Sequence, residues 1–216
     1  VSAKYAFQSF KKECDNGDLK RCRDTAELYL CGTGVDVDTD EAVSLTRSKC
    51  DAGYGPSCFD LGGYAEHGML GKPDDELALK NYMISCDGGF VGGCNSSFEG
   101  LLKRFMHRTG EVTNAEYTKM ITYAEKACDL GSAHGCSTLS RAFKTGWQDI
   151  VDIDVERSLM YLDKACNFGD LQTCENLREM YSKGNGVIED PVKKFEYSVK
   201  LCEHGDARGC ALVGTY

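Results

Sequence analysis

The chain has 216 residues and a formal net charge of −9 at pH 7. An acidic chain lacks the basic surface that nucleic-acid binding requires, and no run of about 18 apolar residues is present that would span a membrane. Hydrophobic residues make up 42% of the sequence and are spread along it, as in a folded chain. The chain begins with Val1 rather than methionine, so we expect a mature or trimmed form.

Cysteine is the most informative residue type, with 13 copies. Twelve form six pairs with the spacing C-x7-C, namely Cys14 and Cys22, Cys50 and Cys58, Cys86 and Cys94, Cys128 and Cys136, Cys166 and Cys174, and Cys202 and Cys210. The second members follow one another at steps of 36, 36, 42, 38 and 36 residues. An internal repeat of this length is typical of a solenoid, in which each unit packs only on its neighbours.

Each repeat predicts two helices that meet at a glycine turn. A glycine stands three residues after the first cysteine of every pair, at Gly17, Gly53, Gly89, Gly131, Gly169 and Gly205. Glycine adopts the left-handed conformation that ends many helices, so one helix should end near each first cysteine and the next begin near the second. Apolar residues recur at helical spacing on both sides, as at Leu79, Tyr82 and Cys86. Strand signals are absent, and the predicted fold class is all-α.

In chain order, these elements predict one repeat domain over residues 1–216 with about twelve helices. The repeats divide it into a half-unit 1–14, units at roughly 15–50, 51–86, 87–128, 129–166 and 167–202, and a half-unit 203–216. Glycine-rich segments such as 32–35 and 184–187 are expected to join the helices between turns. The third unit departs from the pattern by an insertion of six residues within 101–118, and the fourth has a different loop at 146–150.

The repeat resembles the Sel-one-like repeat, a relative of the tetratricopeptide repeat. The matching residues are Leu61-Gly62…Ala65…Gly68, Leu177…Tyr181…Gly184-Asn185-Gly186-Val187…Asp190 and Ala124…Ala127-Cys128-Asp129-Leu130-Gly131. The cysteine spacing is similar to that of the Helicobacter cysteine-rich proteins, a secreted bacterial branch. The resemblance covers essentially the whole chain and implies a right-handed α/α superhelical solenoid. Solenoids usually bind protein or peptide ligands on their concave face, and no cofactor is expected.

The paired cysteines are either metal ligands or disulfides. Zinc sites place two to four residues between their cysteines and add histidine, which is nearly absent from these pairs. We therefore predict six disulfides, each within one pair, and no metal site. Each would close a loop of about nine residues and stabilise the fold by roughly 2–3 kcal/mol. Disulfides require an oxidising compartment, which is the exterior, the periplasm or, as the alternative, the mitochondrial intermembrane space.

Polar positions two, five and nine after each second cysteine are expected to lie on the concave face, because a helix turns by about 100° per residue. The candidate binding residues are Asp24, Glu27, Asp60, His67, Glu99, Lys103, Arg141, Glu179 and Lys183. The same positions also hold Gly63, Ser96, Thr138, Thr145 and Asn176. The alternative is a solvated helix face with no ligand.

Cys31 is the thirteenth cysteine and has no partner at the common spacing. It stands nine residues after Cys22, in the position of His67, and is predicted to be an accessible free thiol. Gly32 follows it, which places it at a helix C-terminus, where the helix dipole disfavours negative charge. A redox or catalytic role is therefore not expected.

The remaining polar and aromatic signals favour structure over chemistry. Trp147 is the only tryptophan and is predicted to pack rather than to bind. The four histidines, His67, His107, His134 and His204, are dispersed, and the two that lie in or next to glycine turns are expected to be exposed and without function.

The resemblance also implies an enzymatic alternative, a weak β-lactamase or penicillin-binding activity. Ser9-Phe10-Lys11-Lys12 satisfies S-x-x-K and Lys144-Thr145-Gly146 satisfies K-T-G, but S-D-N is absent. The K-T-G residues occupy a repeated helix-end position, so we expect no catalytic centre. A third alternative is an assembly factor of the mitochondrial intermembrane space.

Overall fold

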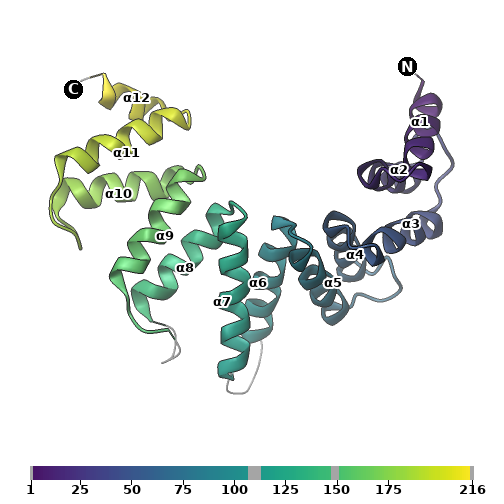
Figure 1. Cartoon of the computed structure of the whole chain (residues 1–216), viewed down its shortest axis with the longest axis horizontal. Helices are drawn as coiled ribbons and strands as arrows, with labels where there is room; N and C mark the ends of the chain where they lie inside the picture. Colours follow the sequence, from purple (N-terminus) through teal and green to yellow (C-terminus); the bar gives the residue numbers. More distant parts are fainter. Residues whose placement is uncertain (1, 107–112, 147–150, 215–216) are drawn as a thin grey trace. The chain divides into compact units, whose positions relative to one another are not determined.

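The computed structural model describes residues 2–106, 113–146 and 151–214, and in these it is all-helical, as predicted (Figure 1). The predicted number of about twelve helices is confirmed by the twelve that these described residues form. The helices are α1 Ala3–Asp15, α2 Leu19–Cys31, α3 Thr39–Asp51, α4 Gly55–Glu66, α5 Asp75–Asp87, α6 Val91–Met106, α7 Asn114–Asp129, α8 Ala133–Thr145, α9 Val155–Asn167, α10 Leu171–Lys183, α11 Pro191–Glu203 and α12 Ala207–Val213.

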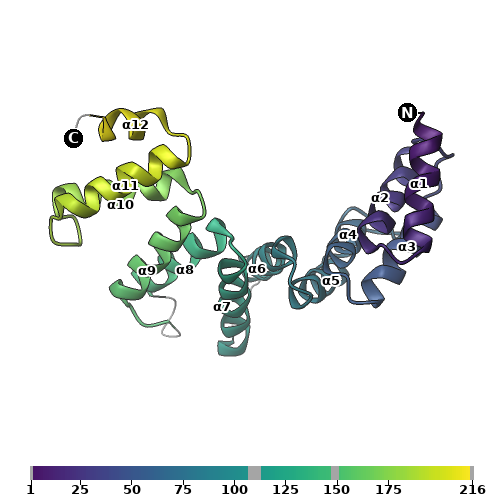
Figure 2. The same cartoon turned by 45° about the horizontal axis from the view of Figure 1, so that its top comes forward.

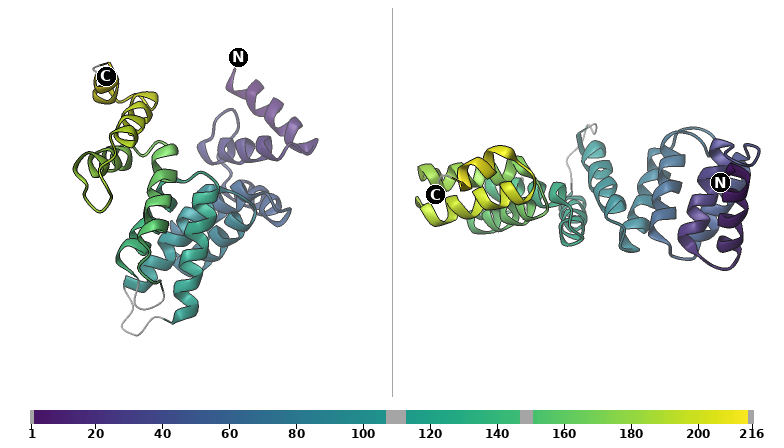
Figure 3. Two further views of the ribbon diagram at one scale, coloured as in Figure 1. Left: turned by 60° about the vertical axis from the view of Figure 1, so that its left-hand side comes forward. Right: turned by 90° about the horizontal axis from the view of Figure 1, so that it is seen from above.

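The helices fall into two compact units. Unit 1 spans Val1–Thr109 and holds α1 to α6, and unit 2 spans Gly110–Tyr216 and holds α7 to α12. Within each unit, consecutive helices pack on each other as successive hairpins (Figures 2 and 3). The single domain over residues 1–216 stays a prediction.

The six short turns between paired helices share one backbone pattern. In the first, Gly17 N–H donates to Cys14 O at 2.8 Å, and Asp18 N–H donates to Glu13 O at 3.1 Å. Both bonds recur in the five later turns, and the six turn glycines have φ between +78° and +97°. This is the Schellman arrangement, in which a left-handed residue lets the last carbonyls of a helix find donors. The glycine spacing therefore predicted these helix ends correctly.

Four longer connections are fixed by aspartates that the sequence analysis did not treat as structural. Asp38, Asp74, Asp154 and Asp190 cap α3, α5, α9 and α11 by accepting from backbone N–H groups of the first turn. Each also donates its own N–H to a carbonyl of the preceding helix, at 2.8 to 3.0 Å. Each aspartate thus satisfies orphan donors of one helix and ties it to the previous helix.

Close packing between neighbouring helices uses small residues and aromatic rings. A Cβ at Gly62 of α4 would lie 2.6 Å from Cδ1 of Tyr82, so the ring lies directly on the α4 backbone. In unit 2, Tyr181 of α10 and Tyr197 of α11 stack with ring centroids 5.8 Å apart. Such pairs add roughly 0.5–1.5 kcal/mol to the free energy of apolar burial.

Candidate binding surface

Six disulfides join the helix pairs, each within one C-x7-C pair, as predicted. The bridges are Cys14–Cys22, Cys50–Cys58, Cys86–Cys94, Cys128–Cys136, Cys166–Cys174 and Cys202–Cys210. Their Cα atoms are 4.5 to 4.8 Å apart, which the turn geometry itself provides.

The bridges differ in their exposure to solvent. Both cysteines of each of the first five bridges are buried, and Cys58, Cys94 and Cys136 are each 0% exposed. These residues are therefore structural and cannot contact a ligand on the binding face. In the sixth bridge, Cys202 is half-buried and Cys210 is exposed. The first five bridges are part of the core, and the sixth lies at the surface.

Cys31 has no disulfide partner and is exposed. It is the last residue of α2, and Gly32 follows it in the left-handed conformation. These positions agree with the predicted helix end, whereas the reactivity of the thiol stays a prediction.

The candidate residues of unit 1 lie on α2, α4 and α6 or just beyond their ends. Glu27, His67, Glu99 and Lys103 are exposed, as expected for a binding face. Asp24 is half-buried and accepts from Arg21 at 3.0 Å within the same helix. These residues are accessible on the first helix after each glycine turn.

Asp60 connects two repeats rather than facing solvent freely. Its carboxylate accepts from Arg23 Nε at 2.6 Å and from Arg23 Nη2 at 2.9 Å, so the ion pair is bidentate and joins α2 to α4. The bond to Asp60 raises the pKa of the Arg23 guanidinium. His67 follows α4, and its Nδ1 lies 2.8 Å from Gly63 O. Asp60 therefore has a structural role besides its position on the candidate face.

A pocket of about 390 Å³ opens beside this face between α4, α5 and α6. Its residues are Glu66, Asp75, Glu76, Ala78, Leu79, Tyr82, Ser96, Glu99, Gly100, Lys103 and Arg104. Ala78, Leu79 and Tyr82 are buried and form an apolar floor, whereas the charged residues form the rim. Two of the candidate residues, Glu99 and Lys103, belong to this rim. The floor and the rest of the rim were not predicted from the sequence.

Tyr82 connects the floor of the pocket to its rim. Its hydroxyl donates to Glu66 Oε2 at 2.7 Å. Burial, together with this bond and the nearby carboxylates, raises the pKa of Tyr82 far above its ordinary value of 10.0. The phenol therefore stays protonated and holds the Glu66 carboxylate at the pocket edge.

In unit 2, the prediction of a concave-face position was wrong for Thr138, which is 1% exposed. Asp170 at the start of α10 accepts from Ser137 of α8 at 3.1 Å, which brings the next repeat against this part of α8. Arg141 and Thr145 are exposed on α8, and Asn176, Glu179 and Lys183 are exposed on α10. Glu179 and Lys183 form an ion pair of 3.3 Å with each other.

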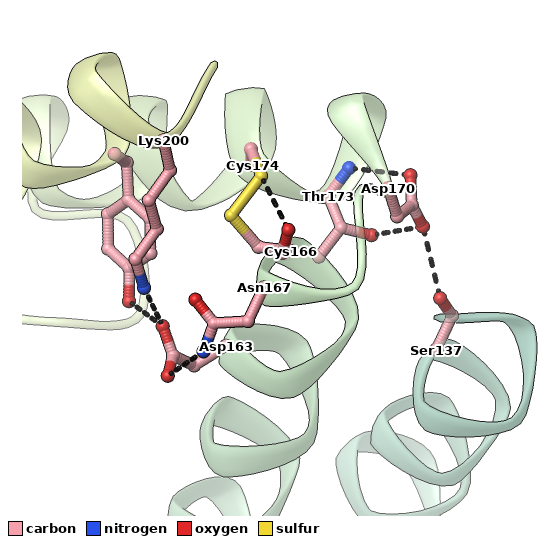
Figure 4. Close-up of a disulfide and its surroundings, with 9 residues drawn as sticks. Ser137, Asp163, Cys166, Asn167, Asp170, Thr173, Cys174 and Lys200 are labelled. Carbon is pink, nitrogen blue, oxygen red and sulfur yellow. Dashed lines mark hydrogen bonds and ion pairs between the residues drawn. A yellow bond between two sulfur atoms is a disulfide. The ribbon is translucent and has the colours of Figure 1, made fainter. Parts of the chain in front are cut away.

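Polar contacts between repeats are a second set of residues that the sequence analysis missed. Asp163 of α9 accepts from Lys200 at 2.7 Å and from Tyr197 at 3.1 Å, both on α11 (Figure 4). Figure 4 also shows Asp170 bound to Ser137 and Thr173 beside the Cys166–Cys174 bridge. These contacts fix the spacing of neighbouring repeats in unit 2.

The two β-lactamase-like motifs lie in different units. Ser9 of α1 donates its hydroxyl to Glu13 at 2.9 Å, and Glu13 in turn accepts from Arg21. Thr145 ends α8, and its hydroxyl donates to the Arg141 carbonyl at 3.0 Å. Both hydroxyls thus bond within the local helical structure.

Some predicted features have no described position. Trp147 and His107 lie outside the described residues, so the packing role of Trp147 stays a prediction. His134 and His204 are exposed, as expected. In the described part of the chain, no three His, Cys, Asp or Glu side chains cluster as metal ligands would. None of the described helices has the length and apolar character to cross a membrane.

Comparison with known proteins agrees with the repeat pattern. The family model of the Sel1 repeat matches residues 22–54, 55–90, 121–132, 135–170 and 177–206. The chain is 30% identical to cytochrome c oxidase assembly factor 7A of Xenopus laevis over 124 residues, which cover 55% of this chain and 52% of that protein. The chain thus spans about half the length of this relative.

Solved structures share the helical repeat fold. A Sel1 repeat protein from Oxalobacter formigenes matches with a TM-score of 0.65 and 18% identity, over 92% of this chain and 78% of that one. Helicobacter pylori cysteine rich protein B matches with a TM-score of 0.44 and 25% identity, over 65% of this chain and 95% of that one. The family model covers more than half of the sequence and the helix pairs have the matching fold, so the chain belongs to the Sel1 repeat family.

Proposed function

We propose that this chain is a scaffold that binds a protein or peptide through the exposed residues of α2, α4 and α6. The observation that carries this proposal is the pocket beside Glu99 and Lys103, which combines an apolar floor with a charged rim. Protein interfaces have the same composition, with a buried apolar anchor and polar surroundings. Repeat proteins of this kind commonly act as interaction modules.

The six disulfides support a location in an oxidising compartment. Reducing cytosol does not keep structural disulfides, and six bridges in one short repeat array indicate that the chain folds where thiols are oxidised. The exterior, the periplasm and the mitochondrial intermembrane space all meet this condition.

Charge reversal on the candidate face tests the scaffold function. The variant with Glu27→Lys and Glu99→Lys should lose the partner that chemical cross-linking captures in the native compartment. The matched control reverses two exposed acids elsewhere, Asp51→Lys on α3 and Glu196→Lys on α11. The control should retain the partner. Equal capture by both variants would show that this face does not bind.

A second candidate is an assembly factor of the mitochondrial intermembrane space. It is favoured by the relative from Xenopus laevis, which is named cytochrome c oxidase assembly factor 7A. In this function the scaffold would bind a subunit or another factor during assembly of the oxidase.

Localisation and loss of function separate this candidate from a secreted or periplasmic scaffold. Fractionation with protease protection should place the protein behind the outer mitochondrial membrane, and deletion of its gene should lower the cytochrome c oxidase content. Recovery from the culture medium, with an unchanged oxidase content after deletion, would exclude the assembly role.

A further inference from the structure

Gly100 is one of the residues that line the pocket between α4, α5 and α6, and it differs from the residue at the same place in the other repeats. Six residues after the second cysteine, the other repeats carry Leu28, Tyr64, Ala142 and Met180, but this repeat carries Gly100. A Cβ at Gly100 would lie 3.1 Å from Leu79 Cδ1. A side chain at this position would therefore crowd Leu79 at the floor of the pocket.

The space has the size and the floor of a site for apolar side chains. Its volume of about 390 Å³ lies within the range of roughly 300–1,000 Å³ that is typical of ligand sites. Leu79 and Tyr82 are each 8% exposed and Ala78 is 2% exposed, so the floor is apolar and well packed. An aliphatic side chain that enters it would remove its own surface and part of the floor from water.

The charges on the rim determine which ligand residues can flank that aliphatic side chain. The rim holds four carboxylates, Glu66, Asp75, Glu76 and Glu99, and two cations, Lys103 and Arg104. Both cations already form ion pairs between α5 and α6: Lys103 with Asp75 at 3.1 Å, and Arg104 with Glu76 at 2.8 Å. Because four carboxylates outnumber two cations, the described rim residues carry a net negative charge, which favours a positively charged ligand.

We propose that this pocket binds a basic peptide segment of the partner, with one aliphatic side chain above Leu79 and a Lys or Arg beside it at the rim. This proposal rests on the proposed scaffold function and names the chemistry of the ligand. The residue at position 100 determines whether the aliphatic side chain fits, and the net negative charge of the rim attracts the cation.

Synthetic peptides test the proposal directly. The probe is a short fluorescein-labelled peptide with one Leu between two Lys residues, and the controls replace both Lys by Glu or the Leu by Ala. Fluorescence anisotropy should show saturable binding of the probe that weakens as salt increases. Each control peptide should bind at least roughly tenfold more weakly, because one buried aliphatic side chain or a matched charge is lost.

Variants at Gly100 test whether the probe binds in the pocket. Gly100→Met gives this repeat the residue that the repeat of α10 has at the same position, and Gly100→Ala gives it the residue of α8. Both residues form helices better than glycine does, so both variants should fold, which circular dichroism verifies. Gly100→Met should weaken probe binding at least roughly tenfold, with a smaller loss for Gly100→Ala.

Two matched variants, each of which removes one carboxylate, test the role of the rim charge. Glu99→Gln should weaken binding of the probe roughly two- to fivefold. Glu179→Gln, at the same repeat position on α10, should leave the binding unchanged. Equal binding of the Lys and Glu peptides, no binding of any peptide, or full binding by Gly100→Met would each overturn the proposal. If Gly100→Met still captures the native partner in the cross-linking experiment, the scaffold function stands and only the pocket assignment fails.

Discussion

Lys200 Nζ on α11 lies 2.7 Å from Asp163 Oδ1 on α9, and these residues are 37 positions apart in the sequence. Tyr197 and Asn167 also donate to the same carboxylate, at 3.1 and 3.0 Å. One half-buried carboxylate thus accepts from Asn167 of its own helix and from two residues of α11, and it ties two repeats together.

We expect Asp163→Asn to destabilise unit 2 by about 1 kcal/mol, since it weakens a charged hydrogen bond between repeats that is partly screened by solvent. The measurement is urea denaturation at pH 7. Glu179→Gln is the control, because Glu179 pairs with Lys183 of its own helix at an exposed surface. The control should change the free energy of unfolding by less than about 0.5 kcal/mol. An equal effect of the two variants would contradict the role of Asp163.

The stability that Asp163 provides should depend on pH. Burial acts to raise the pKa of Asp163, but the Lys200 ammonium and the Tyr197 and Asn167 donors outweigh it, so the pKa lies below its ordinary value of 3.8. Such a group stabilises the fold fully above its unfolded pKa and loses this effect as the pH falls through the lower folded pKa. The difference in stability between the wild type and Asp163→Asn should therefore be constant near neutral pH and shrink only below about pH 4. A difference that changes between pH 6 and pH 8 would point to another group.

The regular part of the fold was predictable from the sequence because it depends on local chemistry. Gly17 and its five counterparts mark helix ends, since a positive φ strongly favours glycine. The disulfides were predictable because each pair lies eight positions apart around such a turn. Neither conclusion needs knowledge of how distant residues meet.

The contacts between repeats were not predictable in the same way. Periodicity shows that Asp163 lies near a helix surface, but it does not show that Lys200 of the next repeat faces it. Helical periodicity predicts exposure for Thr138, but it is 1% exposed, and the bond from Ser137 to Asp170 shows that the next repeat lies against this part of α8. The pocket is lined by Gly100 together with side chains of three helices, and periodicity alone does not show that these residues lie around one space.

Glycines at helix contacts should respond to substitution according to the space around them. A Cβ at Gly93 of α6 would collide with the Ser85 hydroxyl and lie 2.7 Å from the Cys86 backbone nitrogen. We expect Gly93→Ala to lower the free energy of unfolding by about 1–3 kcal/mol. Thermal or urea denaturation measures the change.

Gly63 of α4 is the matched control for Gly93. It is also inside a helix, but the nearest atom to its Cβ position is the Tyr82 hydroxyl oxygen at 4.0 Å. Alanine there gains helix propensity without a clash, so Gly63→Ala should stabilise the protein by about 0.5–1 kcal/mol. Destabilisation by both variants to the same extent would show that the packing around Gly93 is looser than described.

The Ser9 hydroxyl is expected to have no catalytic role. It donates to Glu13 one helical turn away, and its partner is also engaged by Arg21. Hydrolysis of a chromogenic β-lactam should therefore be the same for the wild type and Ser9→Ala. Turnover that disappears with Ser9→Ala, but not with the exposed control Ser44→Ala, would establish the enzymatic alternative.

The cysteines should react in an order set by their exposure. Without reductant, alkylation of the native protein followed by peptide mapping should modify Cys31 alone, because it is exposed and every other cysteine is in a disulfide. Limited reduction without denaturant should next release Cys202 and Cys210, since a reductant reaches an exposed sulfur more readily than a buried one.

The five buried bridges should open only when the helices around them unfold, and full reduction should then lower the melting temperature markedly. Each bridge contributes roughly 2–3 kcal/mol by restricting the unfolded chain, and the contributions add along a repeat array. Coincident melting of the oxidised and reduced forms would show that the bridges are not structural. Modification of Cys166 or Cys174 before Cys202 and Cys210 would contradict the burial of the Cys166–Cys174 bridge, whose cysteines are both 0% exposed.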